Sequence, residues 1–470
     1  MRITSPGVAA ERALTAVIAD LEAHAAELEP GERLPSVREL MARHRVGPVT
    51  VQRAVATLAA RGVLEPRPGR GTYVAPRAAE APPPDFAWQT VALGPRTVDP
   101  GGLDDLLRPP EPGAHVLSTG YLPPDLQPLG ALSQALARAA RRPGAWDRMP
   151  LEGLAQLRAW FAAQVGGGVG AGDVLICLGG QAALIACLRG LAAPGAAVLV
   201  ESPTYLGALS AAHASGLRPV PVPSDGDGVR PELLEEAFAA TGSRVFYCQP
   251  TFANPHGAVL APARREEALE IVRRAGAFLI EDEPFRDLAL DGRPPPPMLH
   301  ADPDGHVVHV RSLTKAAAPG LRVSAVVARG PAAARLRPTQ IVDGALVPGA
   351  LQEAAVELVT APGWTRHLSR TRTALRERRD ALLAAVEAEL GPGRVAGQSR
   401  GGMHLWVQLD PGEDDVALAG RAARAGVIVS PGRPYFPAEP AGSFLRVTYA
   451  GEPPDRLAAG VRLLAGARRQ

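Results

Sequence analysis

Five short apolar segments between residues 174 and 312 constrain the fold of this chain more than any other feature. Segments with the helical spacing of apolar residues separate them, and the five read VLICL at 174, AVLVES at 197, RVFYCQ at 244, AFLIED at 277 and HVVHVRS at 306. Strands buried on both faces have this composition, and helices between them indicate parallel pairing. We therefore predict a doubly wound α/β domain that extends to about residue 345.

The remainder of the chain, from about residue 346 to 470, has a different pattern. A long helical segment, WTRHLSRTRTALRERRDALLAAVEAEL, precedes two strand-like segments, GGMHLWVQL and SFLRVTYA. This order predicts a smaller α+β subdomain. We expect the domain over residues 111–470 to divide into a large subdomain at about 141–345 and a small one that combines 346–470 with 111–140.

The N-terminal part is distinguished by its charge. The whole chain has a net charge of +2, but the segment from Arg33 to Val74 contains eight arginines and only two acidic residues. Such asymmetry favours an anionic partner, although a solvated basic face on a protein-interaction domain would look similar. We expect a domain over residues 1–75 and, from its proline and alanine content, a linker over 76–110.

Helix signals can be assigned within the basic segment. Residues 9–28 have amphipathic spacing, and Ser36 with Glu39 forms the pattern of a capping box at the start of a second helix. We expect Val37, Leu40 and Met41 to face inward on that second helix.

A third helix and a hairpin complete the basic segment. Pro48 is suited to the first position of a helix, and a hairpin is predicted around a Pro-Gly turn at 68–69. The helix would turn its outward N-terminal residues, and the hairpin its arginines, toward DNA. These candidate contacts are Thr50, Gln52, Arg53, Arg67 and Arg70.

The basic segment resembles the DNA-binding domain of the GntR family. The similarity covers residues 31–75 and includes LPSVREL, TVQRA and GRGTYV. It implies a winged helix-turn-helix that binds a double-stranded DNA operator. By the same resemblance, the family's DNA contacts fall on Arg38, Thr50, Arg53, Arg70 and Gly71.

Lys315 is the only lysine in the chain, which otherwise uses 49 arginines as its long cations. A guanidinium stays protonated, whereas a lysine amine can lose its proton and attack a carbonyl. The single lysine therefore suggests amine chemistry. A chance survivor of an arginine-rich coding bias is the alternative, which the surrounding residues must decide.

Candidate cofactor ligands surround Lys315 in the predicted fold. Gly180 and Gln181 open a helix directly after the strand VLICL, where backbone N–H groups favour a phosphate. Ser312 and Arg322 flank Lys315 and can bind the same phosphate. Asp282 ends the strand AFLIED, at the sheet edge where ligands of α/β folds bind.

Six motifs over residues 115–465 are similar, in their order, to class I aminotransferases of fold type I: LGGQAAL, ESPTYLG, QPTFANPHG, IEDEPF, SLTKAAAPGLR and FLRVTYA. The resemblance implies pyridoxal 5′-phosphate (PLP), bound to Lys315 as an internal aldimine, with Asp282 at the pyridinium nitrogen. Asn254 would bind the ring hydroxyl, Tyr205 would stack on the ring, and Arg446 would bind an effector carboxylate.

Two departures from that family bear on turnover. Phe285 stands where most relatives have a tyrosine, and the segment near Arg148 lacks another tyrosine that the family often has. PLP binding is expected to survive these losses, but efficient transamination is not.

The layout of the whole chain resembles the MocR-type transcriptional regulators. This resemblance implies a cytoplasmic homodimer that senses an amine or amino-acid effector through the aldimine at Lys315, with the aminotransferase-like domain used for sensing. Two alternatives stay open. The chain would be a working aminotransferase with an accessory DNA-binding domain, or a scaffold that never binds PLP.

Other classes of site find little support. Cys177, Cys187 and Cys248 form no CxxC pair, and His306 and His309 would face opposite sides of one strand, so we expect no metal site. The chain shows neither a secretory signal pattern nor an apolar run long enough to cross a membrane, which agrees with a cytoplasmic location.

Overall fold

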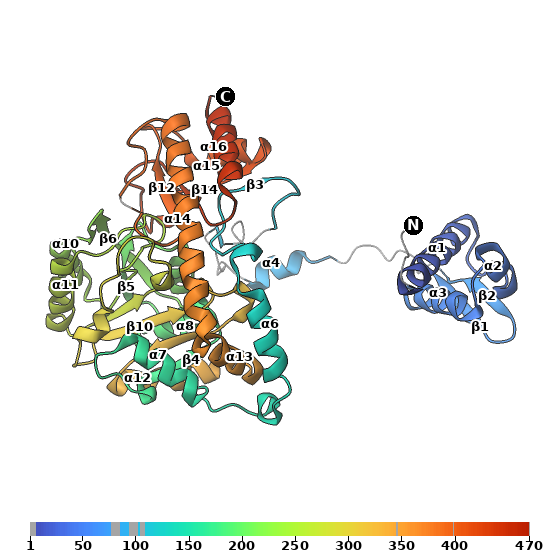
Figure 1. The fold of residues 1–470 in the computed structure, drawn as a ribbon, viewed down its shortest axis with the longest axis horizontal. Coiled ribbons are helices and arrows are strands. Elements are labelled where there is room, and N and C mark those ends of the chain that lie inside the picture. The colour runs from blue at the N-terminus through green and yellow to red at the C-terminus, as the bar shows by residue number, and fades with distance from the viewer. Residues whose placement is uncertain are drawn as a thin grey trace. The chain divides into compact units, whose positions relative to one another are not determined.

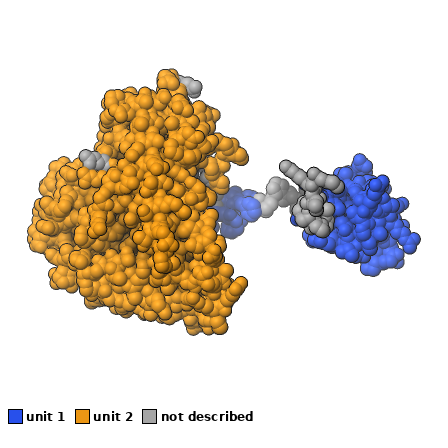
Figure 2. Space-filling model, in the orientation of Figure 1, with its two compact units in different colours: residues 1–96 blue, residues 97–470 orange. Residues whose placement is uncertain are grey.

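The computed structural model describes residues 6–76, 85–93, 102–103, 109–344, 346–397 and 399–469. Two compact units divide the chain, residues 1–96 and residues 97–470 (Figures 1 and 2). Much of the predicted linker at 76–110 lies outside the described residues. The described part of it includes a short helix, α4 (Ala87–Leu93).

The first unit is a winged helix-turn-helix. Three helices pack around one core, and a two-stranded antiparallel hairpin closes it with Leu64 opposite Val74. The core includes Val17, Leu21 and Leu58. The elements are α1 (Pro6–Glu27), α2 (Val37–His44), α3 (Pro48–Ala60), β1 (Leu64–Arg67) and β2 (Gly71–Val74).

The capping box at the start of α2 is confirmed. The Glu39 backbone N–H donates to Ser36 Oγ at 3.3 Å, and the Ser36 backbone N–H donates to the Glu39 carboxylate at 2.6 Å. That backbone hydrogen bond lowers the pKa of Glu39. Leu40 is buried and Met41 packs against the core, but Val37 is 38 % exposed. The prediction that Val37 faces inward is wrong, because this first helical residue lies beyond the edge of the core.

The large sheet of the second unit has eight strands in the order β4-β11-β10-β9-β8-β5-β6-β7. All five strands predicted from the apolar segments are confirmed, and they pair in parallel except where β11 intervenes. The eight strands are β4 (Val174–Cys177), β5 (Ala197–Ser202), β6 (Arg218–Asp225), β7 (Gly228–Val229), β8 (Val245–Cys248), β9 (Phe278–Asp282), β10 (Val307–Ser312) and β11 (Ser324–Val327).

The sequence patterns did not predict β6 and β11, which have eight and four residues. Strand β11 runs antiparallel to both β10 and β4, so the sheet is mixed. Strand β6 has proline at every second position, at 219, 221 and 223, which disguised it. The Arg218 N–H donates to the Ala196 carbonyl, next to β5. The prolines follow at the alternate positions of the strand, where the backbone nitrogens point away from β5 and no N–H is needed for pairing with it.

Helices cover both faces of the large sheet (Figure 1). One face packs against α8, α9 and α12, and the other against α7, α10, α11 and α13. Side chains at 347–368, a segment that the sequence analysis assigned to the smaller subdomain, contribute to the core of this second face. The helices are α7 (Ala155–Val165), α8 (Gly179–Leu191), α9 (Leu206–Ala214), α10 (Pro231–Thr241), α11 (Pro262–Arg274), α12 (Gly330–Val342) and α13 (Gly349–Thr360).

The C-terminal part forms a separate core around a small antiparallel sheet of order β12-β15-β14. A short strand, β13 (Val427–Ile428), pairs in parallel with β3 (His115–Val116). Helix α6 (Leu129–Ala139) packs against α13. The other elements are β12 (His404–Gln408), β14 (Ser430–Pro431), β15 (Phe444–Thr448), α14 (Pro362–Leu390), α15 (Asp415–Arg424) and α16 (Pro454–Arg468). No helix of the described part combines the length and apolar composition of a membrane span.

The capping box generates a stability prediction. Replacing Ser36 with alanine removes the side-chain acceptor, so we expect the free energy of local opening of α2 to fall by about 1 kcal/mol. Hydrogen exchange of the α2 amides in the full-length protein measures this change. Ser36→Thr keeps the acceptor and serves as the matched control. Equal exchange in Ser36→Ala and Ser36→Thr would contradict the assigned role of the cap.

Candidate functional site

A cavity of about 390 Å³ opens at the carboxyl ends of the central strands. Its lining residues follow β4, β5, β8, β9 and β10, which is where α/β sheets bind ligands. The lining brings together all eight residues predicted to bind the cofactor: Gly180, Gln181, Tyr205, Asn254, Asp282, Ser312, Lys315 and Arg322.

Lys315 lies within this cavity, and its amine points toward the backbone carbonyl of Gly120. Its Nζ donates to the Gly120 carbonyl at 2.8 Å and lies 4.0 Å from the ring centroid of Tyr121. Burial lowers the pKa of Lys315 to about 7, the positive charge of Arg446 adds to this, and Asp282 opposes it. A substantial fraction of the amine is therefore unprotonated near neutral pH and available to attack a carbonyl.

Asp282 is held at the end of β9 by two neutral donors. Its Oδ2 accepts hydrogen bonds from the Tyr247 hydroxyl and from Gln249 Nε2, both at 2.8 Å. Burial raises the pKa of Asp282, and the two hydrogen bonds oppose that rise. The arrangement fits a carboxylate that pairs with a protonated ring nitrogen. Sequence reasoning missed Tyr247 and Gln249, although both are polar residues within an otherwise apolar segment.

Another part of the cavity lining has the features of an anion cradle. Arg322 has a left-handed backbone, with φ of 51°, and its Nη2 donates to the Leu178 carbonyl at 3.3 Å. A Cβ at Gly179 would overlap the Arg322 guanidinium, so this close approach requires glycine. Gly180 lies in the first turn of the helix beside Ser312, where backbone N–H groups favour a phosphate.

An unpartnered hydroxyl supports the fit to a phosphorylated cofactor. Thr314 Oγ1 is buried, lines the cavity and has no hydrogen-bond partner among the described residues. Ser312 Oγ accepts a hydrogen bond from the Thr314 backbone N–H at 3.1 Å, which leaves the Ser312 hydroxyl proton available for a phosphate oxygen. These groups fit the phosphate of PLP, and Lys315 and Asp282 line the same cavity.

Two further predicted residues hold each other in place. The Tyr205 hydroxyl donates to Gln181 Oε1 at 3.2 Å, and Gln181 Nε2 donates to the Gly207 carbonyl at 2.8 Å. Burial raises the pKa of Tyr205, which therefore stays a neutral phenol. The side chain of Gln181 thus fixes the ring of Tyr205 and leaves the Gln181 backbone as its contribution to an anion site.

Arg446 contacts Asn254 and is not among the residues that line the cavity. Its Nη1 donates to Asn254 Oδ1 at 3.3 Å, its Nη2 donates to the Ser118 carbonyl, and the Tyr435 ring centroid lies 5.3 Å from its guanidinium carbon. Its Nε is buried without a partner in the described structure. One donor of Arg446 is therefore unpaired within the described chain, and its role as a carboxylate clamp stays a prediction.

Sequence reasoning missed two residues that narrow the cavity. Tyr121 covers the amine of Lys315, and Leu103 lines the same cavity and packs on the aromatic cluster of Trp406, Tyr435 and Phe436. Leu103 falls within the segment predicted to be a linker, and nothing in its local sequence signals this contact. Phe285 also lines the cavity, so no hydroxyl is present at that position.

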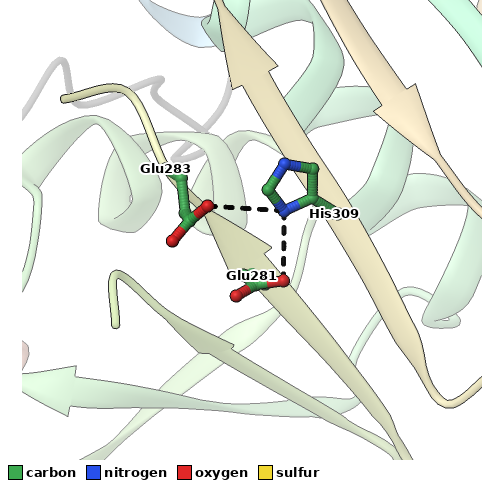
Figure 3. A group of neighbouring side chains, drawn as sticks. All are labelled: Glu281, Glu283 and His309. Carbon is green, nitrogen blue, oxygen red and sulfur yellow. Dashed lines mark hydrogen bonds and ion pairs between the residues drawn. The ribbon is translucent and has the colours of Figure 1, made fainter. Parts of the chain in front are cut away.

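A buried polar network lies on the other face of β9. Figure 3 shows His309 between Glu281 and Glu283, with Nδ1 at 3.1 Å from the first carboxylate and 3.9 Å from the second. Successive strand residues alternate faces, so these glutamates point away from the side of Asp282. The spacing of the three ligand atoms would suit a metal ion.

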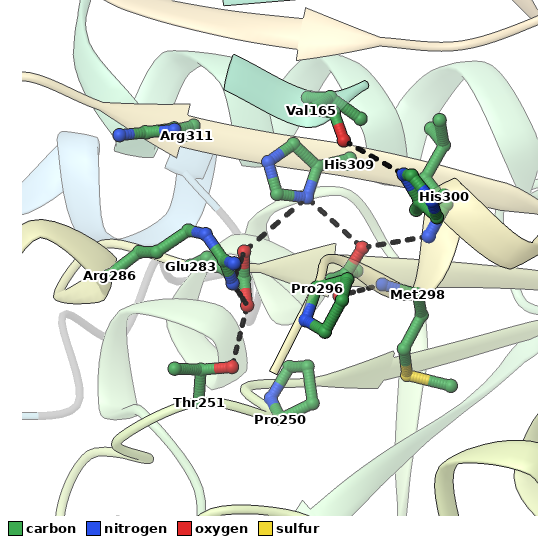
Figure 4. A network of polar contacts seen from close by, with 12 residues as sticks. Val165, Pro250, Thr251, Glu283, Arg286, Pro296, Met298, His300, His309 and Arg311 are labelled. Carbon is green, nitrogen blue, oxygen red and sulfur yellow. Dashed lines mark hydrogen bonds and ion pairs between the residues drawn. The ribbon is translucent and has the colours of Figure 1, made fainter. Parts of the chain in front are cut away.

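Existing partners already occupy the two carboxylates of that network. Arg265 lies 3.5 Å from Glu281. Arg286 lies 2.9 Å from Glu283, and the Thr251 hydroxyl donates to Glu283 at 2.6 Å (Figure 4). Burial opposes ionisation of Glu281, but its hydrogen bond with His309 and the charge of Arg265 together lower its pKa. We therefore interpret the network as a structural brace for the end of β9.

The predicted DNA contacts all belong to the first unit. Arg38, Gln52, Arg53 and Arg70 are exposed, and Thr50 is half-buried.

Two of the remaining wing residues have structural partners. Arg67 pairs with Glu65 at 2.9 Å and lies over the Tyr73 ring, so a DNA phosphate would compete with that carboxylate, and the role of Arg67 as a DNA contact stays a prediction. Gly71 has φ of 117°, and a Cβ there would lie 2.8 Å from Arg33 Nε, so the wing requires glycine at this position.

Family comparisons match both units. The family of class I and II aminotransferases matches residues 124–464, and the gntR family of bacterial regulatory proteins matches residues 13–74. The uncharacterized HTH-type transcriptional regulator YdfD of Bacillus subtilis (strain 168) is 27 % identical over 429 residues, which is 89 % of this chain and 88 % of that protein.

Two proteins named as aminotransferases are also similar. The 2-aminoadipate transaminase of Thermus thermophilus is 32 % identical over 362 residues, covering 76 % of this chain and 90 % of that enzyme. The crystal structure of LysN, an alpha-aminoadipate aminotransferase of Thermus thermophilus in complex with N-(5′-phosphopyridoxyl)-L-leucine, superposes with a TM-score of 0.73. It is 31 % identical and covers 78 % of this chain and 94 % of its own.

Fold, motif order and family matches agree across both units, and the predicted fold class is confirmed. The chain therefore belongs to the class I and II aminotransferase family, and a helix-turn-helix domain of the gntR family of bacterial regulatory proteins precedes its aminotransferase domain.

Proposed function

We propose that this protein is a PLP-dependent, DNA-binding transcriptional regulator of the MocR type, which senses an amine or amino acid. One observation carries the proposal. The only lysine of the chain lies in a cavity with the seven other predicted cofactor ligands, and the same chain carries a gntR-family helix-turn-helix domain. The relative YdfD, named as a transcriptional regulator, matches nearly the whole chain, which supports a regulatory role.

The residues of the cavity divide into three functions toward PLP. The cofactor supplies an aldehyde that forms an imine with an amine, and Lys315 is the amine that this chain offers. Asp282 would hold the ring nitrogen protonated, and Asn254 would bind the ring hydroxyl. The backbone at Gly180, together with Ser312 and Arg322, would hold the phosphate.

The amine of the effector would replace the Lys315 amine at the imine carbon. Arg446 would bind the effector carboxylate through its unpaired Nε. The complex of LysN with a phosphopyridoxyl amino acid supports this class of ligand for a fold of the same family. An effector shifts the regulator between two states only by its different affinity for each.

We propose a cytoplasmic homodimer, because two DNA-binding domains in one dimer suit repeated DNA half-sites.

A working aminotransferase is the second candidate. The cavity that brings together all eight predicted cofactor ligands and the similarity to 2-aminoadipate transaminase favour it. Phe285 and the missing tyrosine near Arg148 argue against efficient turnover, since each removes a hydroxyl from the site. Turnover of an amino acid with a 2-oxo acid, measured beside DNA binding, separates the two candidates.

The imine gives the first test of this function. Purified protein with PLP should show a visible-edge absorbance band that Lys315→Ala and Lys315→Arg both abolish, because guanidinium forms no imine. Borohydride reduction followed by peptide mapping should place the cofactor on Lys315. A band that survives in both variants would overturn the cofactor assignment, and an amine titration that shifts the band would identify the effector class.

The depressed pKa of Lys315 predicts a pH dependence. Only the neutral amine attacks the PLP aldehyde, so the rate of PLP incorporation should rise with pH through about 7 and level off above it. Stopped-flow absorbance measures this rate. An inflection near the ordinary lysine pKa of about 10.4 would show that the burial of the amine has no such effect. Asp282→Asn, which removes the stabilising carboxylate, should move the inflection to lower pH.

The DNA-binding unit gives a third test. Arg70→Ala should weaken binding to duplex DNA and reduce the slope of log K against log salt by about 1, as expected for the loss of one phosphate contact. Fluorescence anisotropy with a random-sequence duplex at low salt measures both quantities. Arg274→Ala removes an exposed arginine of the second unit, paired with Glu235, and is the matched control. An unchanged slope in Arg70→Ala would remove that residue from the interface.

A further inference from the structure

A second cavity of about 420 Å³ lies in the aminotransferase domain and shares no lining residue with the cofactor cavity. This volume is in the range of small-molecule sites. One wall comes from the large sheet and its loops, with Pro203, Pro221 and Pro223. The other comes from the C-terminal part, with Trp406 and Phe444.

The walls of the second cavity suit a flat apolar molecule. The rings of Trp406 and Phe444 stack at a centroid distance of 4.9 Å and an interplanar angle of 12°, and Phe436 lies beside them. The prolines of the opposite wall present rigid apolar surfaces, and of the two serines beside them Ser224 already donates its hydroxyl to the Ser202 carbonyl. Aromatic molecules gain most from such surfaces, because flat rings bury large apolar areas against them.

His256 supplies a polar group to this apolar lining, and its tautomer can be assigned. The Ala258 backbone N–H donates to His256 Nδ1 at 3.2 Å, so Nδ1 carries a lone pair. Burial lowers the pKa of His256 to about 4, and the ring is therefore neutral with its proton on Nε2. That Nε2–H group is buried and has no acceptor among the described residues. A bound acceptor would satisfy it.

The charges around the cavity disfavour an anion. Within the described structure no lysine or arginine lines it, and Asp225 and Glu439 are its charged residues. Asp225 is already paired with Arg264 through both carboxylate oxygens, at 2.6 and 3.0 Å. An anionic ligand would find no cation in this lining, whereas an uncharged one loses little on desolvation.

We propose that this second cavity is a ligand site for an uncharged planar aromatic molecule that carries a hydrogen-bond acceptor, with His256 Nε2–H as the donor. The site lies next to segments that position cofactor ligands. Pro203 precedes Tyr205 by two residues, and His256 follows Asn254 by two. Because the two cavities share no lining residue, the ligand is distinct from the amine effector, and its binding does not require Lys315.

The probe for this site is 4-fluorobenzamide, whose amide accepts a hydrogen bond and forms no imine. Fluorine NMR titration of the full-length protein with PLP present should give a dissociation constant on the order of 1 mM, as expected for a fragment of about ten non-hydrogen atoms. The anion 4-fluorobenzoate should bind at least about tenfold more weakly, given the lack of a cation in the lining.

Three variants locate the probe. Ala441→Trp places a bulky ring in the lining at an exposed position and should abolish binding, whereas Ala240→Trp, at an exposed position on α10, should not. His256→Phe removes the donor and should weaken binding about tenfold. Thermal unfolding of each variant establishes that it folds.

Each outcome decides for or against the site. Binding that survives Ala441→Trp, equal binding of benzamide and benzoate, or no detectable binding of the benzamide would overturn the proposal. Lys315→Ala should leave benzamide binding unchanged, so failure of the cofactor assignment and failure of this site are distinguishable. Loss of benzamide binding in Lys315→Ala would assign the probe to the cofactor cavity and would also overturn the second site.

Discussion

The unfavourable burial of one ammonium group governs the chemistry of this protein. The positive charges of Arg446 and Arg322 act on Lys315, and the carboxylate of Asp282 opposes them. A charged amine is costly in such a site, so the neutral and nucleophilic form is accessible near pH 7. Tyr247 and Gln249 hold the Asp282 carboxylate in place by hydrogen bonds. Both donors are neutral, so they do not cancel the negative charge of Asp282, which opposes the effect of the two arginines on Lys315.

The alternation of side chains along β9 allows one strand to serve two purposes. Asp282 faces the cofactor cavity, while Glu281 and Glu283 face a buried network with His309, Arg265 and Arg286. Paired charges in that network fix the backbone at the point where the strand ends. Asp282 therefore stands between two glutamates whose carboxylates have partners on the opposite face of the sheet.

Local pattern predicted much of the fold, and its failures have physical causes. The five central strands were found because burial on both faces requires continuous apolar sequence. Strand β6 was missed because proline at every second position is unusual in a strand, although these positions do not bond to β5. Strand β11 was missed because the four residues Ser-Ala-Val-Val carry no pattern that marks an antiparallel strand between two others. Val37 was assigned to the core from helical spacing alone, although in the first turn of α2 Leu40 is the residue that enters the core and Val37 stays 38 % exposed.

The sequence by itself determined the chemistry that the chain can perform. A single lysine, a glycine turn after a strand, an aspartate at a strand end and a basic N-terminal segment are covalent facts, and each limits the cofactor or the partner through its own functional groups. Only the tertiary structure decided how these groups are tuned. The pKa of Lys315, the pairing of Arg67 with Glu65, the cover that Tyr121 and Leu103 provide, and the unpartnered donor of His256 depend on how the folded chain places its groups in space. Desolvation and hydrogen bonding act through space, so no local sequence pattern encodes them.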